Sequence, residues 1–323
     1  MKLVILDDWE NFFYNNDKIE ELRNHFDVEI FHDKPTSEVL IERIKHADVI
    51  IPIRERTIFS KEVLREMRCI KLIAQTGTGL AHIDLEEATR LGIPVATTPG
   101  GSSAVVELIF GFIIAHSRNL IPLDQNMKNG LWDEPIGIGL ENKTIGIIGL
   151  GKIGTGVAKV AKAFNMNVIA WGPRLTKERA LEQNVVYSDF EQLLQKSHFV
   201  VIAVRLVPQT KHLLTESHFN MMRRDAFLIN TSRGEVVDEE ALLIALKENK
   251  IGGAGLDVFS VEPLFSDHPI LKLTNVILSP HIGWKTDKMF HNFLSVSIEN
   301  IISYIFHKQP IRIANLEVLN TNS

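Results

Sequence analysis

A glycine-rich run in the middle of the chain has the residue types needed to hold a pyrophosphate. The apolar segment Thr144–Ile148 leads directly into Gly149-Leu-Gly-Lys-Ile-Gly154, and a helical pattern follows. In this G-x-G-x-x-G spacing the first glycine permits a sharp turn, the second lets a pyrophosphate approach the backbone, and the third lets helix and strand pack closely. The N–H groups that begin the helix then face the phosphates. A tight structural turn is the alternative, but the flanking strand and helix favour a dinucleotide site at Gly149, Gly151, Lys152, Ile153 and Gly154.

The end of the next apolar segment indicates which nicotinamide cofactor such a site prefers. An NAD site places an acidic residue here, on the ribose 2′-hydroxyl. This chain has Gly172 at that point, and Arg174 follows two residues later, where it can pair with a 2′-phosphate. We therefore predict NADP(H) as the favoured cofactor and NAD(H) as the alternative, for which Arg174 would be an ordinary solvated side chain.

Two further polar side chains, Arg233 and His281, follow apolar segments. Arg233 lies in the polar turn after residues 226–230, and His281 follows Pro280 after residues 276–278. An arginine where a parallel strand ends can hold a carboxylate in two-point contact. Histidine exchanges a proton near neutral pH, which suits acid–base catalysis. Both residue types are also common on solvated surfaces, so residue type alone leaves that reading open for each.

The elements that must position these residues begin with an alternation of strands and helices. Apolar segments with the length and β-branching of buried parallel strands cover residues 3–6, 28–31, 49–53, 71–74 and 94–97. Helical patterns lie between them at residues 19–24, 36–46, 60–67 and 85–91, and Thr36, Ser60 and Asp84 carry helix-start signals. This alternation predicts a doubly wound α/β unit.

A second α/β unit is expected after a long apolar helix. Residues 103–117 are apolar nearly all round, so this helix must be buried on most sides, between domains or in a dimer interface. Strands are expected at residues 145–148, 168–171, 200–204, 226–230, 253–257 and 276–278, and a last helix at 289–305 should return to the first unit. The prediction is an α/β protein with two doubly wound parallel-sheet domains, a discontinuous one at 1–98 plus 290–323 and one at 99–289. A ligand cleft is expected between them.

Composition narrows the class of protein further. The net charge of −5 argues against nucleic-acid and anionic-membrane partners, because both need a basic surface. The single cysteine, Cys69, excludes an intrachain disulfide and fits a reducing cytoplasm, and we expect it to be a small buried side chain. The longest apolar stretch, residues 105–115, contains Glu107 and is too short to span a bilayer. No cluster of side chains has metal-ligand spacing. We therefore expect a cytoplasmic protein without a metal, nucleic-acid or membrane partner.

Taken together, the motifs resemble those of the NAD(P)-dependent D-2-hydroxyacid dehydrogenases, including the phosphoglycerate dehydrogenase-like and glyoxylate/hydroxypyruvate reductase-like members. The resemblance covers residues 53–281 and rests on the joint order of six motifs. These are Arg54-Glu-Arg-Thr, Gly77-Thr-Gly-Leu-Ala-His-Ile-Asp84, the glycine run, Asn230-Thr-Ser-Arg-Gly234, Asp257-Val-Phe-Ser-Val-Glu-Pro263 and Ser279-Pro-His-Ile-Gly283.

This resemblance implies a Rossmann-type cofactor domain and a flavodoxin-like substrate domain, with a role for each matching residue. Arg233 would hold the substrate carboxylate, His281 would give a proton to the carbonyl oxygen, and Glu262 would hydrogen-bond the imidazole and stabilise its charged form. Asp257 would bind the nicotinamide carboxamide, and Thr231 would also contact the cofactor. Arg54, Thr78 and Gly79 would contact the substrate.

The leading interpretation is hydride transfer between NAD(P)H and a small 2-oxo or 2-hydroxy acid such as glyoxylate or hydroxypyruvate. Phosphoglycerate dehydrogenase activity is one alternative, and it would need extra cations, for which Arg54 and Arg56 are the near candidates. A nucleotide-sensing, corepressor-like protein is the other. The apolar helix at 105–114 favours a homodimer, although packing between domains explains it equally well.

Overall fold

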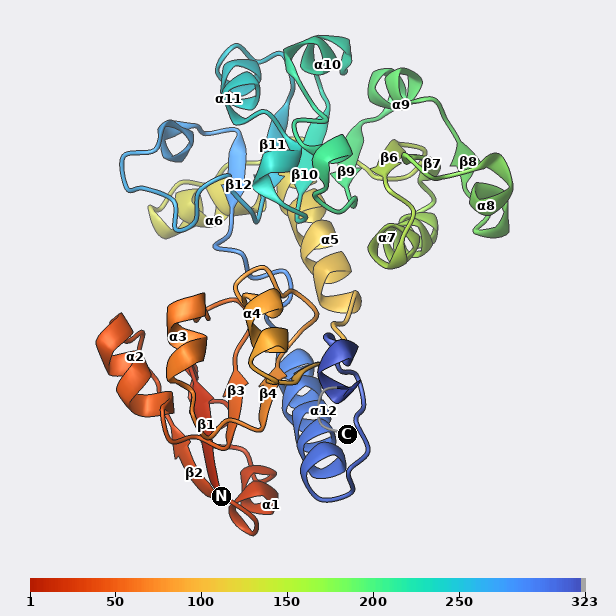
Figure 1. Ribbon diagram of the computed structural model, residues 1–323. Coiled ribbons are helices and arrows are strands. Elements are labelled where there is room, and N and C mark those ends of the chain that lie inside the picture. Colours follow the sequence, from red (N-terminus) through yellow and green to blue (C-terminus); the bar gives the residue numbers. More distant parts are fainter. Residues whose placement is uncertain (321–323) are drawn as a thin grey trace. The chain divides into compact units, whose positions relative to one another are not determined.

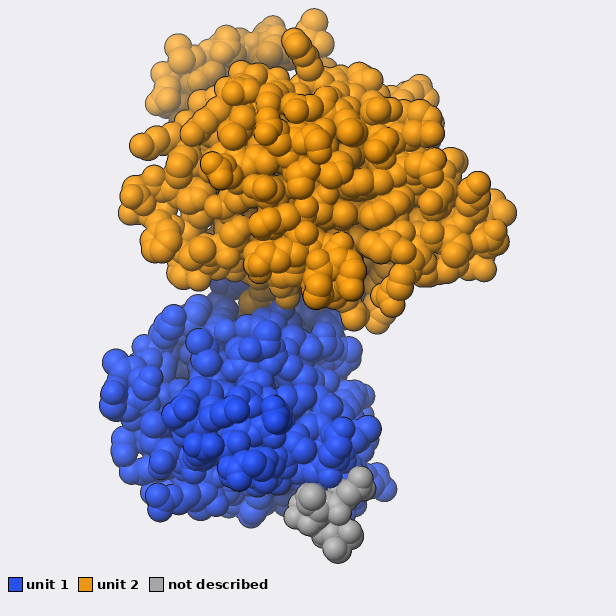
Figure 2. Space-filling view, turned by 45° about the horizontal axis from the view of Figure 1, so that its top comes forward, with its two compact units in different colours: residues 1–100, 285–323 blue, residues 101–284 orange. Residues whose placement is uncertain are grey.

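The computed structural model describes residues 1–320, and the chain divides into two compact units (Figure 2). Unit 1 comprises residues 1–100 together with the chain from Lys285 onward, and unit 2 comprises Gly101–Trp284. Unit 1 is therefore built from two separate stretches of chain.

Unit 1 has a five-stranded, wholly parallel sheet in the order β2-β1-β3-β4-β5 (Figure 1). Its strands are β1 (Lys2–Leu6), β2 (Asp27–Ile30), β3 (Val49–Pro52), β4 (Leu72–Gln75) and β5 (Val95–Thr97). Its helices are α1 (Ile19–Arg23), α2 (Ser37–Ile44), α3 (Lys61–Glu66), α4 (Leu85–Arg90) and α12 (Asp287–Ile305), with a short 3-10 turn at Leu316–Asn320. The strand order reverses direction between β1 and β3, which makes the loops after these two strands the expected ligand position of this sheet.

Alternation along the strands explains how this sheet is covered. Val4, Ile50 and Ile73 are fully buried and point to one face, where they pack on the apolar sides of α2, α3 and α4. Thr36, Ser60 and Asp84 each accept a hydrogen bond from the first turn of a following helix, so the predicted helix starts are confirmed.

Unit 2 has a seven-stranded parallel sheet in the order β12-β11-β10-β9-β6-β7-β8. Its strands are β6 (Thr144–Ile148), β7 (Asn167–Trp171), β8 (Val186–Tyr187), β9 (Phe199–Ile202), β10 (Phe227–Asn230), β11 (Gly253–Leu256) and β12 (Val276–Leu278). Its helices are α5 (Ser103–Ser117), α6 (Leu120–Lys128), α7 (Lys152–Ala163), α8 (Lys177–Glu182), α9 (Phe190–Lys196), α10 (Glu216–Met221) and α11 (Glu239–Lys247). Short 3-10 turns lie at Pro208–Thr210, Gly234–Val236 and Pro269–Lys272. In this sheet the strand order reverses direction between β6 and β9.

Both faces of this second sheet are buried. One apolar cluster joins α5, α7 and α8 to one face, and another joins α9, α10 and α11 to the other. Since a parallel sheet covered on both faces needs continuous apolar strands, the short apolar runs of the sequence are explained. The predicted α/β class with two doubly wound parallel sheets is confirmed.

Four features of the structure add to or differ from what the sequence predicts. Strand β8 has only two residues, too few to form a recognisable apolar run in the sequence. Helix α6 was also not expected. Cys69 is exposed rather than buried, because it lies in the loop that follows α3. Helix α5 has the predicted ends, but Phe112 packs on Gly255 of β11 and Val106 on Gly156 of α7. Its apolar surface therefore covers the sheet of its own unit and does not by itself indicate a dimer.

Candidate active site

The glycine run of unit 2 has the shape of a phosphate-binding turn. Gly149 has a φ of 102°, and a Cβ at this position would lie 2.7 Å from the carbonyl oxygen of Ala203, beyond β9. A Cβ at Gly154 would lie 2.0 Å from the carbonyl oxygen of Gly149, so α7 can approach β6 only with glycine there. A Cβ at Gly151, by contrast, would meet no atom within 4 Å, which leaves open space beside the backbone.

This open space lies at the start of α7, a helix of twelve residues without a side-chain cap. The N–H groups of Lys152, Ile153 and Gly154 belong to its first turn, where an α-helix offers no internal acceptor. The turn also lies where the strand order reverses, between β6 and β9. These residues therefore fit the pyrophosphate of a dinucleotide.

The end of β7 lies beside this turn. The N–H of Gly149 donates to the carbonyl oxygen of Trp171 at 2.6 Å, and a Cβ at Gly172 would lie 3.5 Å from Gly149 Cα. Arg174 is exposed, and its carbonyl oxygen accepts a hydrogen bond from Arg179 Nη1 at 3.0 Å. Arg174 therefore lies two residues beyond Gly172, with its side chain exposed.

His281 and Glu262 form a direct pair in unit 2. His281 Nδ1 and Glu262 Oε2 lie 2.6 Å apart, and Glu262 Oε1 accepts a hydrogen bond from the N–H of Phe259 at 2.9 Å. Both carboxylate oxygens are therefore engaged, which fixes the ring. Within the described residues, His281 Nε2 makes no hydrogen bond, and the imidazole is about one-third exposed. Such a ring can pass a proton to a bound molecule through Nε2.

The charge of Glu262 is held in place by its neighbours. Partial burial raises the pKa of Glu262, but the hydrogen bonds from His281 and Phe259 outweigh this effect, as do the positive charges of His281 and Arg233. The pKa of Glu262 therefore lies below its ordinary value, and the carboxylate stays ionised at neutral pH. Arg233 is exposed, and its Nη1 donates to the carbonyl oxygen of Ser232 at 2.7 Å.

The backbone at His281 is in the left-handed region, with a φ of 55°. A non-glycine residue there costs of order 1–3 kcal/mol, so its surroundings must hold it. Asp257 does so. It is 1% exposed and accepts hydrogen bonds from Ser279 Oγ at 2.5 Å and from the N–H groups of Ile282 and Gly283 at 2.8 Å. Asp257 thus anchors the turn that carries His281, a role that no motif or spacing in the sequence indicates. Thr231 is half-buried, two residues before Arg233.

In unit 1, the remaining candidates gather in the loops after β3 and β4. The N–H groups of Thr78, Gly79 and Leu80 make no hydrogen bond within the described residues, so three successive amides can receive an anion. Arg54 also has a left-handed backbone, with a φ of 59°. Its Nη1 lies against Gly77, since a Cβ there would be 2.0 Å from that nitrogen.

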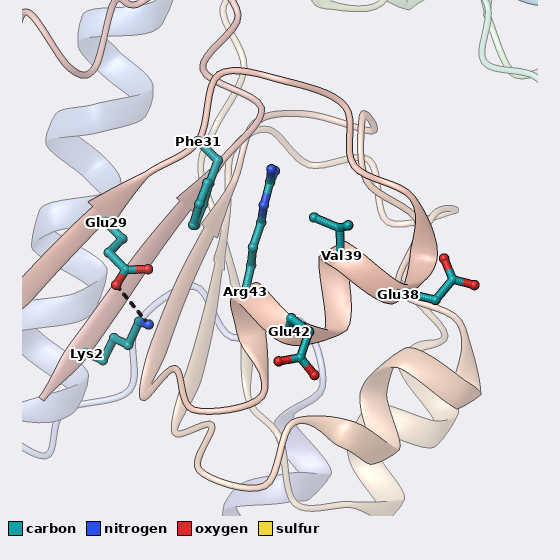
Figure 3. Close-up of a pocket in the computed structure, with 7 residues that line it drawn as sticks. All are labelled: Lys2, Glu29, Phe31, Glu38, Val39, Glu42 and Arg43. Atoms are coloured by element: carbon teal, nitrogen blue, oxygen red, sulfur yellow. Dashed lines mark ion pairs between the residues drawn. The ribbon is translucent and has the colours of Figure 1, made fainter.

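Other features of the chain lie apart from these residues. A pocket of about 350 Å³ between β2 and α2 is lined by Lys2, Glu29, Phe31, Glu38, Val39, Glu42 and Arg43 (Figure 3), and contains no predicted site residue. Among residues 1–320, no group of three or more potential metal ligands occurs. In the same range, no individual helix has the length and apolarity to cross a bilayer; only the bent pair α5 and α6 has them jointly.

Comparison with known proteins indicates the family to which the chain belongs. Residues 110–283 match the family model described as D-isomer specific 2-hydroxyacid dehydrogenase, NAD binding domain. A glyoxylate reductase of Thermococcus litoralis is 36% identical over 94% of this chain and 95% of its own. The crystal structure of a phosphoglycerate oxidoreductase from Vibrio cholerae O395 superposes with a TM-score of 0.86 at 32% identity, over 94% of this chain and 98% of that one. An acyclic imino acid reductase, Bsp5, solved in complex with NADPH and D-Arg, superposes with a TM-score of 0.81 at 30% identity, over 97% and 99% of the two chains.

Proposed function

The chain belongs to the D-isomer specific 2-hydroxyacid dehydrogenases, and we propose that within this family it reduces a short 2-oxo acid, glyoxylate or hydroxypyruvate. The proposal is carried by the His281–Glu262 pair, in which Nδ1 of His281 is bound to Glu262 and Nε2 is open. The positive charge of Arg233 also acts on Glu262. The name of the Thermococcus relative, which is aligned over nearly the whole chain, supports glyoxylate as the substrate.

In the proposed reaction, each side chain has a separate task. Arg233 binds the substrate carboxylate in two-point contact and draws electron density from the adjacent carbonyl group. His281 gives the proton on Nε2 to the carbonyl oxygen, and Glu262 holds the ring and stabilises its charged form. The bound nicotinamide supplies the hydride that the carbonyl carbon receives. In the oxidation direction His281 takes the proton back.

We assign the cofactor to unit 2 and the substrate loop to unit 1. The open space at Gly151, the uncapped start of α7 and the half-buried Thr231 support the first assignment. The buried carboxylate of Asp257 keeps further acceptor capacity for a carboxamide N–H, although three donors already engage it. The amides of Thr78 and Gly79 support the second assignment, and Arg54 lies beside them.

NADP(H) is the proposed cofactor, with NAD(H) as the alternative. The support is Gly172 in place of a carboxylate, the exposed guanidinium of Arg174 and the NADPH bound by Bsp5. The description of the matched family model names NAD, which keeps the alternative open.

A steady-state assay tests the reaction and the cofactor together. Glyoxylate, hydroxypyruvate and bulkier 2-oxo acids are each offered with NADH and with NADPH, and the loss of reduced cofactor is followed. We expect the highest kcat/KM for a short 2-oxo acid with NADPH. Oxidation of phosphoglycerate in preference to reduction of glyoxylate would favour the activity named for the Vibrio neighbour. No turnover with any of these acids would favour a nucleotide-sensing protein.

We also propose a homodimer, on a different surface from the one expected. Helix α6 has no buried residue, and the segment after it exposes Leu131 (57%), Trp132 (75%) and Ile136 (98%). Such a run of exposed large apolar side chains is typical of an interface, and two-fold pairing of identical chains is the commonest assembly. Replacing Trp132 by Asp should shift the molar mass measured by light scattering from dimer to monomer. A Glu141→Gln variant serves as the control, and a monomeric parent protein would refute the proposal.

A cytoplasmic location stays a prediction.

A further inference from the structure

Two pairs of opposite charges lie in unit 1 where its strand order reverses, in the loops after β1 and β3. On the basis of the proposed function, we infer that Glu55, supported by Glu10, makes the enzyme select 2-oxo acids with a single negative charge and reject those with a second anionic group. The residues that would bind a second anion are already occupied by carboxylates of the chain itself.

Arg56 is the first of these residues. Its Nη1 and Nη2 donate to the two carboxylate oxygens of Glu10, at 2.9 and 2.8 Å, and Nη1 also donates to the carbonyl oxygen of Asp7 at 2.6 Å. The Arg56 side chain is 9% exposed and lies over the ring of Trp9, with 4.2 Å from Cζ to the centroid. Lys285 Nζ contacts the same Glu10 at 2.6 Å. A substrate phosphate or carboxylate would have to compete with Glu10 for either cation, and Glu10 binds Arg56 through both of its oxygens.

Arg54 is the second. Its Nε lies 3.2 Å from Glu55 Oε2, and the two side chains cover the glycine loop together, Arg54 on Gly77 and Glu55 on Gly79. A Cβ at Gly79 would be 2.0 Å from Glu55 Oε1, which shows how closely the carboxylate approaches the loop. This oxygen is buried and has no hydrogen-bond partner within the described residues.

The balance of charges at this position follows from these contacts. Arg54 is paired with Glu55, and Arg56 and Lys285 both contact Glu10, so each of these three cations already has a carboxylate partner in the chain. The free amides beside Gly79 can receive the one carboxylate that every 2-oxo acid has. A second anion near this loop would be repelled by the Glu55 carboxylate, because like charges a few ångströms apart repel strongly near a protein surface.

The test compares two substrates of similar shape and different charge. Oxaloacetate carries a second carboxylate where 4-methyl-2-oxopentanoate carries an isopropyl group, so the ratio of their kcat/KM values reports charge and not size. We expect the parent enzyme to prefer the apolar acid, and Glu55→Gln to raise the oxaloacetate ratio about tenfold. Glu38→Gln is the matched control, because it makes the same change of charge on α2 of the same unit (Figure 3). This control should leave the ratio within about twofold.

The result with glyoxylate separates the possible failures. If the parent enzyme reduces glyoxylate, and neither Glu55→Gln nor Glu55→Ser changes the oxaloacetate ratio, the inference is overturned while the proposed function stands. A parent enzyme that already prefers oxaloacetate overturns it as well. If no 2-oxo acid is reduced with either cofactor, the proposed function fails and this inference fails with it. Thermal unfolding of both Glu55 variants establishes that each is folded.

Discussion

Both units gather charged side chains where their parallel strands end, but they differ in how far those charges are already paired. In unit 2, His281 Nε2 makes no hydrogen bond within the described residues, and Arg233 donates only to the neighbouring carbonyl oxygen of Ser232. In unit 1, Arg56 is bound through both terminal nitrogens to Glu10, and Arg54 is paired with Glu55. A side chain with an unbound donor atom can contact a bound molecule directly, whereas a cation that is already paired must first leave its partner.

The two units also keep a glutamate ionised in different ways. Glu262 is partly exposed and is kept ionised by an imidazole that it positions. For Glu10, burial works against the charge, but hydrogen bonds from Arg56 and Lys285 outweigh it and lower its pKa to about 2. We therefore expect substitutions in unit 2 to affect turnover and substitutions around Glu10 to affect stability.

The largest effect is expected from His281→Ala, which removes the proton donor. Turnover should fall by about 10²–10⁴, the usual contribution of a positioned general acid. The affinity for the reduced cofactor, measured by its fluorescence, should stay within about twofold, because no phosphate contact is lost. Since the backbone there is left-handed, His281→Asn is the matched variant, as asparagine tolerates that conformation. Parental turnover in both variants would remove His281 from the mechanism.

The next effect is expected from Arg233→Lys, which keeps the charge but loses the two-point contact. We expect kcat/KM for glyoxylate to fall about 10–100-fold, because a charge-assisted hydrogen bond contributes about 1.5–3 kcal/mol. Steady-state kinetics at saturating cofactor measure this change. Arg224→Lys, an exposed arginine six residues before the strand end, is the control. An unaltered kcat/KM would mean that the carboxylate binds elsewhere.

A smaller effect, confined to one cofactor, is expected from Arg174→Ala. The dissociation constant for NADPH should rise about tenfold more than that for NADH, because only NADPH has the 2′-phosphate. Titration of the free enzyme with each nucleotide measures both constants. Equal changes for the two cofactors would contradict the assigned role and favour NAD(H).

The smallest effect is expected from Glu10→Gln, and it concerns stability. The pKa of Glu10 is lowered in the folded state, so its contribution is complete above about pH 4.5 and is lost as the pH falls toward 2. At pH 7 the free energy of unfolding of the variant should be about 1 kcal/mol lower than that of the parent, the size expected for a partly exposed ion pair. Urea denaturation at several pH values should show the difference shrinking below pH 4.5. A constant difference down to pH 2 would mean that the charge of Glu10 is not responsible.

The sequence predicts most of the fold because its signals are local. The ends of α5 and the helix starts at Thr36, Ser60 and Asp84 follow from patterns within a few residues, and the structure has them where expected. The two-residue strand β8 is too short for any periodicity to mark it.

The candidate site is predicted less completely, because its contacts are not local. Residue type and position at a strand end single out Arg233 and His281, but the pairing with Glu262 was implied only by the resemblance to a family. The Arg56–Glu10 pair joins residues 46 positions apart and has no sequence motif. A search for carboxylates just after β1 and β3 would have found Glu10 and Glu55, since the reversal of strand order brings those loops together.

The left-handed turn at His281 has a consequence for how this protein would change under selection. Glycine or asparagine would occupy that backbone conformation at lower cost than histidine, so the imidazole is kept against the preference of the polypeptide. A library screened for heat resistance alone should therefore drift away from histidine at position 281, and one screened for catalysis should retain it.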